Sequence, residues 1–530
     1  MTNFTNHFPY PSQRMPVMAR NVVATSQPLA AQAGLQALRD GGNAVDAALC
    51  TAITLTVVEP TSNGIGSDAF CIIHDGAQLH GLNASGRSPA GLDRSKFNGL
   101  DEVPLWGWDG VTVPGCVSAW VALSERFGRL PFERLFEAAI GYARDGFLVS
   151  PITANAWSHI PKDYYEFAAF ASFLPNGKPP QAGQHFRFPD QAKTLEAIAE
   201  SRGERFYRGD IAQKIELSAK AAGAAMTAQD LADHQCDWVD LIAMDYHNVR
   251  LHEIPPNGQG IAALIMLGIL AHHDIAQYPV DSVDSLHCQI EAMKLAFADA
   301  HRYVADPAHM DVSTEQLLDK GYLAERAKLI DMKRASAPTF GELPKGGTVY
   351  LTAADSDGMM VSMIQSNYHG FGSGIVIPDT GISLQNRGAG FSLQPGHPNE
   401  IGPGKRPFHT IIPAFLTQKN GEPLMSFGVM GGPMQPQGHA QMVIRTQDYG
   451  QNPQTASDAP RWQVMKNASV ALDDGYGQAI RQGLMDRGHV IHETKLDPAF
   501  SMGGAQLIQK VEGGYIAGSD HRKDGMAIGF

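Results

Sequence analysis

Residues 346–367 have the sequence GGTVYLTAADSDGMMVSMIQSN, and this stretch predicts two paired strands. Apolar residues recur with a period close to two from Val349 to Ala354 and again after Met359, which is typical of strands. The residues between the two runs, 355–358, include Asp and Gly and have the composition of a tight turn. The stretch therefore predicts a β-hairpin whose first strand begins at Thr348.

Thr348 would become a new N-terminus if the Gly347–Thr348 bond were cut. A terminal threonine carries a hydroxyl nucleophile and an α-amino group that can accept the hydroxyl proton, directly or through water. The polar residues 335–345 next to the bond indicate accessible chain, which a cut requires. On these residues alone, however, a threonine after two glycines is more typical of an ordinary strand start.

Motifs along the whole chain favour the cleavage hypothesis. They are Gly41-Gly42-Asn43-Ala44-Val45-Asp46, Val58-Glu59-Pro60-Thr61-Ser62-Asn63-Gly64-Ile65-Gly66, Val113-Pro114-Gly115, residues 291–299, Gln385-Asn386-Arg387-Gly388, Pro407-Phe408-His409-Thr410, Gly431-Gly432-Pro433 and Asp520-His521-Arg522. Together with the hairpin they resemble the γ-glutamyltransferase family of N-terminal nucleophile hydrolases, whose proenzymes cleave themselves before a threonine. The resemblance implies a large subunit, residues 1–347, and a small subunit, residues 348–530, that together form one αββα unit.

The expected elements support a mixed α/β protein. We expect a strand over residues 22–25, a helix over 28–39 capped by Ser26, a buried apolar helix over 46–58 and a second hairpin over 69–83. One hairpin in each half of the chain suggests two sheets, one from each half, packed face to face. The resemblance implies the four-layer αββα sandwich of the N-terminal nucleophile hydrolases.

The resemblance also implies roles for hydroxyl and glycine residues around Thr348. Ser366 lies where the family places a second hydroxyl that hydrogen-bonds the nucleophile. Gly431 and Gly432 match the glycine pair whose backbone N–H groups hold the oxyanion, and a bare backbone can approach a substrate closely. In isolation, two loop glycines are more often a simple turn.

A second group of residues corresponds to substrate-binding positions of the family. Arg87 matches the arginine that binds the substrate α-carboxylate, and a guanidinium is the natural bidentate partner of that group. His409 and Thr410 lie where the family typically has a serine pair contacting the same carboxylate. We expect all three residues to bind substrate.

The sequence departs from glutathione-using relatives around Arg387. Those relatives have Glu or Gln at this position and an acid at the position of Gly390, and both bind the substrate ammonium. An arginine would repel an ammonium and attract a second carboxylate. Tyr368 likewise replaces the usual asparagine. The pattern resembles the branch of the family with cephalosporin acylase-like proteins and small amidohydrolases such as those acting on oxamate.

Composition argues against several other functions. The net charge of −13, without a cluster of Lys and Arg, argues against nucleic acid as a partner. No segment reaches the roughly 18 consecutive apolar residues of a membrane helix, and the first residues lack a secretory signal. The 5 cysteines have no paired spacing, so we expect buried thiols in a cytoplasmic protein.

We expect neither a cofactor nor a metal. The glycine motifs at Gly64-Ile65-Gly66 and at residues 370–374 lack the spacing and the strand–helix context of a nucleotide-binding fingerprint. His272 and His273 are adjacent, so they point to different faces of a helix, and no spaced histidine pair with a carboxylate accompanies them.

The sequence thus predicts a self-processing threonine amidohydrolase. Its substrate would be a small amide whose acyl group bears a carboxylate, oxamate-like or glutaryl-like, and water or an amine would resolve the acyl-enzyme. Two alternatives stay open: ordinary γ-glutamyl transfer or hydrolysis with glutathione or another γ-glutamyl amide, and an inactive relative kept as a binding or scaffold protein. The two fragments should associate, and a dimer of heterodimers is an open possibility.

Overall fold

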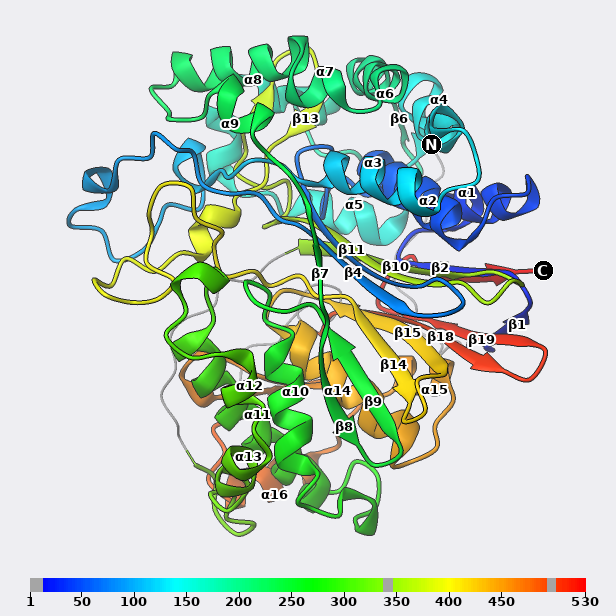
Figure 1. The fold of residues 1–530 in the computed structure, drawn as a ribbon, viewed down its shortest axis with the longest axis vertical. Coiled ribbons are helices and arrows are strands. Elements are labelled where there is room, and N and C mark those ends of the chain that lie inside the picture. The colour runs from blue at the N-terminus through cyan, green and yellow to red at the C-terminus, as the bar shows by residue number, and fades with distance from the viewer. Residues whose placement is uncertain (1–12, 337–346, 493–501) are drawn as a thin grey trace.

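The computed structural model describes residues 13–336, 347–492 and 502–530 of the chain, and two antiparallel seven-stranded sheets dominate these residues. In Figure 1 they lie one above the other, and we name them the upper and the lower sheet. The upper sheet has the order β20 (Met526–Gly529), β2 (Val22–Thr25), β10 (Gly347–Ala354), β11 (Met360–Tyr368), β3 (Asp68–His74), β4 (Leu79–Ala84) and β7 (Asp237–Val239). The lower sheet has the order β1 (Val17–Ala19), β19 (Gly514–Ser519), β18 (Gly504–Val511), β15 (Pro423–Met430), β14 (Ala414–Gln418), β9 (Val249–Glu253) and β8 (Ile242–Tyr246).

Both predicted hairpins are present, but the expectation of one sheet from each half of the chain is wrong. Strands β10 and β11 pair with each other and lie between β2 and β3, so the second-half hairpin is inserted among first-half strands. Leu351 is paired with Met363 on one side and with Thr25 on the other. The insertion pairs β11 with β3 over Met360–Ser366 and the second half of β10 with β2, edges that a two-stranded unit alone would leave open.

Three apolar clusters separate four layers of structure, which confirms the αββα sandwich. Alternate residues of β10 point to opposite faces, as strand geometry requires. Val349 and Leu351 pack toward the upper helices, whereas Tyr350 packs between the sheets together with Phe415 of the lower sheet. A third cluster lies between the lower sheet and its own helices.

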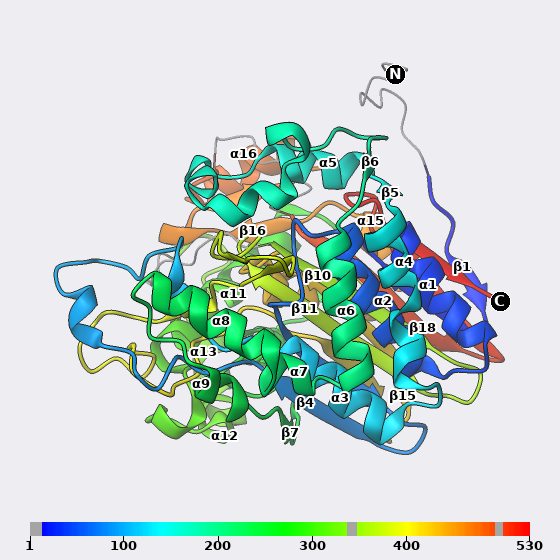
Figure 2. The same ribbon diagram turned by 90° about the horizontal axis from the view of Figure 1, so that it is seen from above.

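Helices α1 (Pro28–Arg39), α2 (Ala44–Val58), α3 (Cys116–Phe127), α4 (Glu137–Asp145) and α6 (Pro189–Ser201) cover the upper sheet, and Figure 2 looks down on this layer. All 15 residues of α2 are buried, as the apolar run predicted. Asn43 caps α2 by accepting from the Asp46 amide, and the Asp46 carboxylate accepts from the Asn43 amide in return. The predicted cap of α1 is wrong: Gln27 accepts from the Leu29 and Ala30 amides, whereas Ser26 donates to Glu59.

The lower sheet is covered on its outer face by another helical layer. Its main members are α10 (Ile261–Leu270), α11 (Val283–Tyr303), α14 (Met434–Gln447) and α15 (Pro453–Asp458). The remaining helices are α5 (Pro151–Ser158), α7 (Glu204–Tyr207), α8 (Asp210–Ala221), α9 (Ala228–Ala232), α12 (Thr314–Leu317), α13 (Lys320–Ala327) and α16 (Gln478–Asp486). The remaining strands are β5 (Phe147–Leu148), β6 (His185–Phe186), β12 (Val376–Ile377), β13 (Ile382–Ser383), β16 (Trp462–Val464) and β17 (Val470–Leu472).

The contact between the sheets is tight where β10 crosses β15. A methyl group on Gly428 would overlap the ring of Tyr350. Tyr350 is fully buried, and its hydroxyl shares a hydrogen bond of 2.7 Å with the Ser362 hydroxyl. We therefore expect Gly428→Ala to lower the free energy of unfolding by about 1–3 kcal/mol, measured by urea denaturation, because overpacking forces strain on both strands.

Gly141 in α4 provides a matched control for this substitution. A Cβ at Gly141 would meet no atom within 4 Å, and the residue is helical. Gly141→Ala should leave the free energy of unfolding unchanged or raise it by up to about 1 kcal/mol. Equal stability of Gly428→Ala and the unmodified protein would contradict the tight packing between the sheets.

Candidate active site

Thr348 and Ser366 lie next to each other at the same end of the β10–β11 hairpin. Both side chains are buried, and the Thr348 hydroxyl donates to Ser366 Oγ at 3.2 Å. The register of the two strands is interrupted between Gly347 and Val349, so Thr348 occupies an irregular position in the ladder. Such irregularities re-aim a side chain and are common beside active sites. The structure therefore brings together the two hydroxyls that the sequence analysis singled out.

Ser366 Oγ collects further donors from the residues around it. It accepts from the Tyr368 amide at 2.8 Å and from Arg387 Nη2 at 3.3 Å. Tyr368 has φ of 78°, which is the left-handed region that a bulky residue rarely adopts. Strained backbone of this kind clusters at functional sites, where the surrounding structure holds it in place.

Arg387 is fully buried, and the groups in direct contact with its guanidinium are neutral. Nη1 donates to Thr410 Oγ1 at 2.7 Å, and the guanidinium lies over the Tyr368 ring at 4.3 Å from its centroid. Nε makes no hydrogen bond, and no carboxylate among the described residues lies within ion-pair distance. Burial lowers the pKa of Arg387 to about 10, although Asp68 and Tyr368 act to raise it. The side chain therefore stays charged at neutral pH.

His409 forms a buried pair with Asp68. His409 Nδ1 accepts from the Ile411 amide at 3.3 Å, so Nε2 carries the hydrogen and donates to Asp68 Oδ2 at 3.0 Å. Burial, and then the charges of Arg387 and Arg406, hold the pKa of His409 well below its ordinary value. The imidazole is therefore neutral, and it is Thr410 that contacts Arg387.

Asp68 was missed by the sequence analysis. Its other oxygen, Oδ1, accepts from the amides of Gly86 and Gly115, each at 3.2 Å. Burial raises the pKa of Asp68 to about 7, against the opposing effects of Arg387 and these two amides. In sequence, Asp68 is only the polar first residue of an apolar strand, and nothing local marks its partners, which are distant along the chain.

Gly431 and Gly432 connect β15 to α14 with positive φ angles of 124° and 58°. Gly431 O accepts from the Met434 amide and Gly432 O from the Gln435 amide, each at 3.1 Å. Among the hydrogen bonds of the described residues, neither glycine amide acts as a donor. Two unengaged N–H groups on adjacent residues can stabilise a developing oxyanion.

Gln259, which the sequence analysis also missed, links these glycines to the residues around Thr348. Its Nε2 donates to Gly432 O at 2.9 Å and to Thr410 O at 2.6 Å. Thr410 in turn binds Arg387, which binds Ser366. The predicted oxyanion pair and the hydroxyl pair therefore belong to one hydrogen-bonded cluster.

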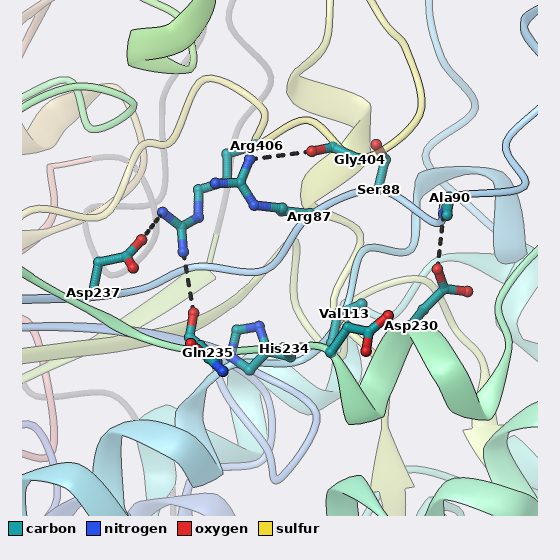
Figure 3. A pocket seen from close by; sticks show the side chains of 11 residues that line it. Arg87, Ser88, Ala90, Val113, Asp230, His234, Gln235, Asp237, Gly404 and Arg406 are labelled. Carbon is teal, nitrogen blue, oxygen red and sulfur yellow. Dashed lines mark hydrogen bonds and ion pairs between the residues drawn. The ribbon is translucent and has the colours of Figure 1, made fainter.

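Arg87 lies in a different environment from the other predicted residues. Its Nη1 pairs with Asp306 Oδ2 at 2.9 Å and donates to Gly404 O at 3.1 Å, and its side chain is 48% exposed. It lines a polar pocket of about 330 Å³ together with Arg406, Asp237 and His234 (Figure 3). Thr348, Ser366 and Arg387 do not line this pocket. Gly86, the residue before Arg87, donates its amide to Asp68 and so connects this segment to the buried site. Contact between Arg87 and a substrate stays a prediction.

Among the described residues, no group of three or more His, Cys, Asp or Glu side chains is arranged to hold a metal ion. No helix in the described ranges combines the length and the apolar character needed to cross a bilayer. All cysteines are unbridged, and Cys50, Cys71, Cys116 and Cys288 are buried as expected, whereas Cys236 is partly exposed.

The αββα sandwich is the fold of the N-terminal nucleophile hydrolases. The family model for gamma-glutamyltranspeptidase matches residues 30–530. The chain belongs to the gamma-glutamyltranspeptidase family.

Individual relatives are similar to this chain over almost its full length. The glutathione hydrolase-like YwrD proenzyme of Bacillus subtilis (strain 168) is 36% identical, over 97% of this chain and 100% of its own. The oxamate amidohydrolase proenzyme of Klebsiella pneumoniae subsp. pneumoniae is 35% identical, over 95% of this chain and 97% of its own. The crystal structure of cephalosporin acylase from Bacillus halodurans has 47% identity and a TM-score of 0.94, and covers 100% of this chain and 99% of that one. The protein is a hydrolase of C–N amide bonds.

Because three donors bind Ser366 Oγ, a substitution of Ser366 tests the Thr348–Ser366 hydroxyl pair. Ser366→Ala would leave the Thr348 hydroxyl, the Tyr368 amide and Arg387 without this acceptor, and each buried unpaired donor costs about 1–3 kcal/mol. We expect kcat to fall about 10–100-fold, measured on a substrate amide, whereas Ser366→Thr should retain most of the activity because it keeps the hydroxyl.

Ser362 offers the matched control on the same strand. Its hydroxyl is equally buried and bonds Tyr350 and Phe427 O, away from Thr348. Ser362→Ala should lower stability without lowering kcat. Equal losses of kcat in the two alanine variants would show that Ser366 acts only through stability.

Proposed function

We propose that this protein is a self-processing threonine amidohydrolase whose substrate is a small amide with a carboxylate on its acyl group. The observation that carries the proposal is the buried Thr348–Ser366–Arg387 arrangement, in which one serine oxygen accepts from both the candidate nucleophile and the cation. The nucleophile, a second hydroxyl and a binding group for an anion thus lie within two hydrogen bonds of each other.

Processing would occur at the Gly347–Thr348 bond and give fragments 1–347 and 348–530, which stay associated. The freed α-amine of Thr348 accepts the proton of its own hydroxyl as Oγ attacks the substrate carbonyl. The proton then passes to the leaving nitrogen as the C–N bond breaks. Water, deprotonated by the same amine, hydrolyses the resulting ester. The word proenzyme in the names of both curated relatives supports a cut of this kind.

The charge of Arg387 determines the class of acyl group. A buried guanidinium without a carboxylate partner is costly, and a substrate carboxylate would supply that partner. Nε is still available, so a carboxylate could be bound by more than one N–H group. Because Arg387 and Thr348 share Ser366 Oγ, the carboxylate would lie close to the scissile carbonyl. This proximity favours a short acyl group, oxamate-like rather than glutaryl-like.

A substrate ammonium has no comparable place. The position where glutathione-using relatives have an acid is Gly390, and a Cβ there would lie 2.8 Å from Phe408 O. Asp68, the carboxylate that most affects Arg387, is already engaged by His409 and two amides. The oxamate amidohydrolase name among the relatives also supports an acyl group without a free amine.

Processing can be tested directly with Thr348→Ala and Thr348→Ser. On a denaturing gel we expect the unmodified protein and Thr348→Ser to give two fragments, the smaller of which begins at residue 348 by mass spectrometry. Thr348→Ala should remain one band near 57.1 kDa and should be inactive, since it lacks the nucleophile. The control is Thr352→Ala, four residues along the same strand, which should still be cut. Normal turnover by Thr348→Ala or by an uncut chain would overturn the proposal.

The acyl preference can be tested with oxamate, a glutaryl amide and a γ-glutamyl anilide. We expect kcat/KM to be highest for a substrate whose acyl group has a carboxylate and no ammonium. Arg387→Met should lower kcat/KM on that substrate about 10–100-fold, in line with the about 1.5–3 kcal/mol of a charged hydrogen bond.

Arg387→Lys separates charge from shape in this experiment. It should recover part of the loss, because the charge remains while the planar fork is absent. A clear preference of the unmodified protein for the γ-glutamyl anilide would instead support ordinary γ-glutamyl transfer or hydrolysis. A processed protein that turns over none of the three amides would favour the alternative of an inactive relative kept as a binding or scaffold protein.

A further inference from the structure

Gln259 joins two loops that the proposed reaction needs in fixed positions. It is fully buried in the loop two residues before α10 begins, and its backbone amide donates to His409 O at 2.9 Å. Its side-chain nitrogen donates to Thr410 O at 2.6 Å and to Gly432 O at 2.9 Å. One amide group therefore holds both the residue that binds Arg387 and the second glycine of the candidate oxyanion pair.

The glycine pair needs such a restraint from outside its own segment. Glycine rotates freely about φ and ψ, so the directions of the Gly431 and Gly432 amides depend on what holds the neighbouring carbonyls. The amides of Met434 and Gln435 bind these carbonyls too, but both residues belong to α14 and follow the loop directly. Gln259 lies in the loop before α10 and contacts the glycine loop independently of α14.

We propose that Gln259 is a positioning residue that fixes the oxyanion-binding glycines relative to the carboxylate-binding side of the site. The inference rests on the proposed function, because it takes Gly431 and Gly432 as the oxyanion donors and the Arg387–Thr410 side as the place of the acyl carboxylate. Gln259 does not touch the reacting atoms in this arrangement. It sets the distance and angle between the groups that do.

The first experiment replaces Gln259 by methionine, which has a similar length and no hydrogen-bond donor. Loss of one oxyanion donor typically costs about 10²–10³ in kcat, so misplacing the donors should lower kcat by about 10–100-fold. KM should change by less than about threefold, since the ground-state carboxylate still meets Arg387 and Thr410. Rates are to be expressed per processed molecule, with the processed fraction measured on a denaturing gel.

Gln441 supplies a matched control within α14. Its side-chain nitrogen also donates to two backbone carbonyls, those of Gln437 and Trp462, and it is 2% exposed. These contacts lie away from the glycine pair, so Gln441→Met should reduce stability to a similar degree without changing kcat. A loss of kcat in both variants that follows their loss of stability would overturn the inference.

A pH profile of Gln259→Glu gives a readout that a merely structural residue would not change. An ionised glutamate faces two carbonyl oxygens and repels both, whereas its protonated form can donate to one of them. Burial raises the pKa of a carboxyl group, so protonation should occur in a range where the protein is folded. The ratio of kcat in Gln259→Glu to kcat in the unmodified protein should therefore rise about fivefold or more as pH falls from 8 to 5.

This comparison uses one folded preparation, so it remains decisive if the methionine variant does not fold or is not processed. A flat ratio across this pH range, or a Gln259→Met enzyme with kcat within twofold of normal, would refute the positioning role. Neither result would affect the assignment of the nucleophile, which depends on Thr348→Ala. Conversely, an active Thr348→Ala protein would remove the proposed function whatever the Gln259 variants do.

Discussion

The pairing of β10 with β11 inside the upper sheet is the constraint on which the rest of the structure depends. The hairpin lies inside the sheet because β3 pairs with β11 over Met360–Ser366 and β2 pairs with Leu351–Ala354 of β10, and both of its faces lie against apolar clusters. A strand buried in this way cannot shift its register without moving its apolar side chains to the wrong face. The irregularity at Thr348 is therefore held by a rigid frame, and the distance from its hydroxyl to Ser366 is set by the sheet.

The second organising feature is the buried charge of Arg387, which no ion pair compensates among the described residues. The structure buries Arg387 with hydroxyl and aromatic partners, and it engages the nearby Asp68 with His409 and backbone amides. The cation is therefore stabilised enough to remain charged but has no carboxylate of its own among the described residues. This balance supports the proposed anionic acyl group, because a substrate carboxylate would complete the pairing.

The two arginines predicted to bind substrate have different positions. Arg387 is in the interior, next to the hydroxyl pair, whereas Arg87 is half exposed, paired with Asp306 and set in a separate polar pocket. An exposed and already paired guanidinium is screened by water and contributes less to binding than a buried one. The charge beside Thr348 is thus the one expected from the sequence to distinguish this chain from glutathione-using relatives, and it supports the proposal of a different acyl group.

The sequence by itself determined the two hairpins, the buried apolar helix α2, the class of fold and the adjacency of the Thr348 and Ser366 hydroxyls. These features depend on local periodicity, on turn residues or on motifs that keep their order along the chain. It did not determine that β10 and β11 insert between first-half strands, that Gln27 rather than Ser26 caps α1, or that Asp68 and Gln259 belong to the site. Only the tertiary structure decided these points, because the partners of Asp68 and Gln259 lie up to 341 residues away, and hydrogen bonds across such separations leave no periodic trace in the sequence.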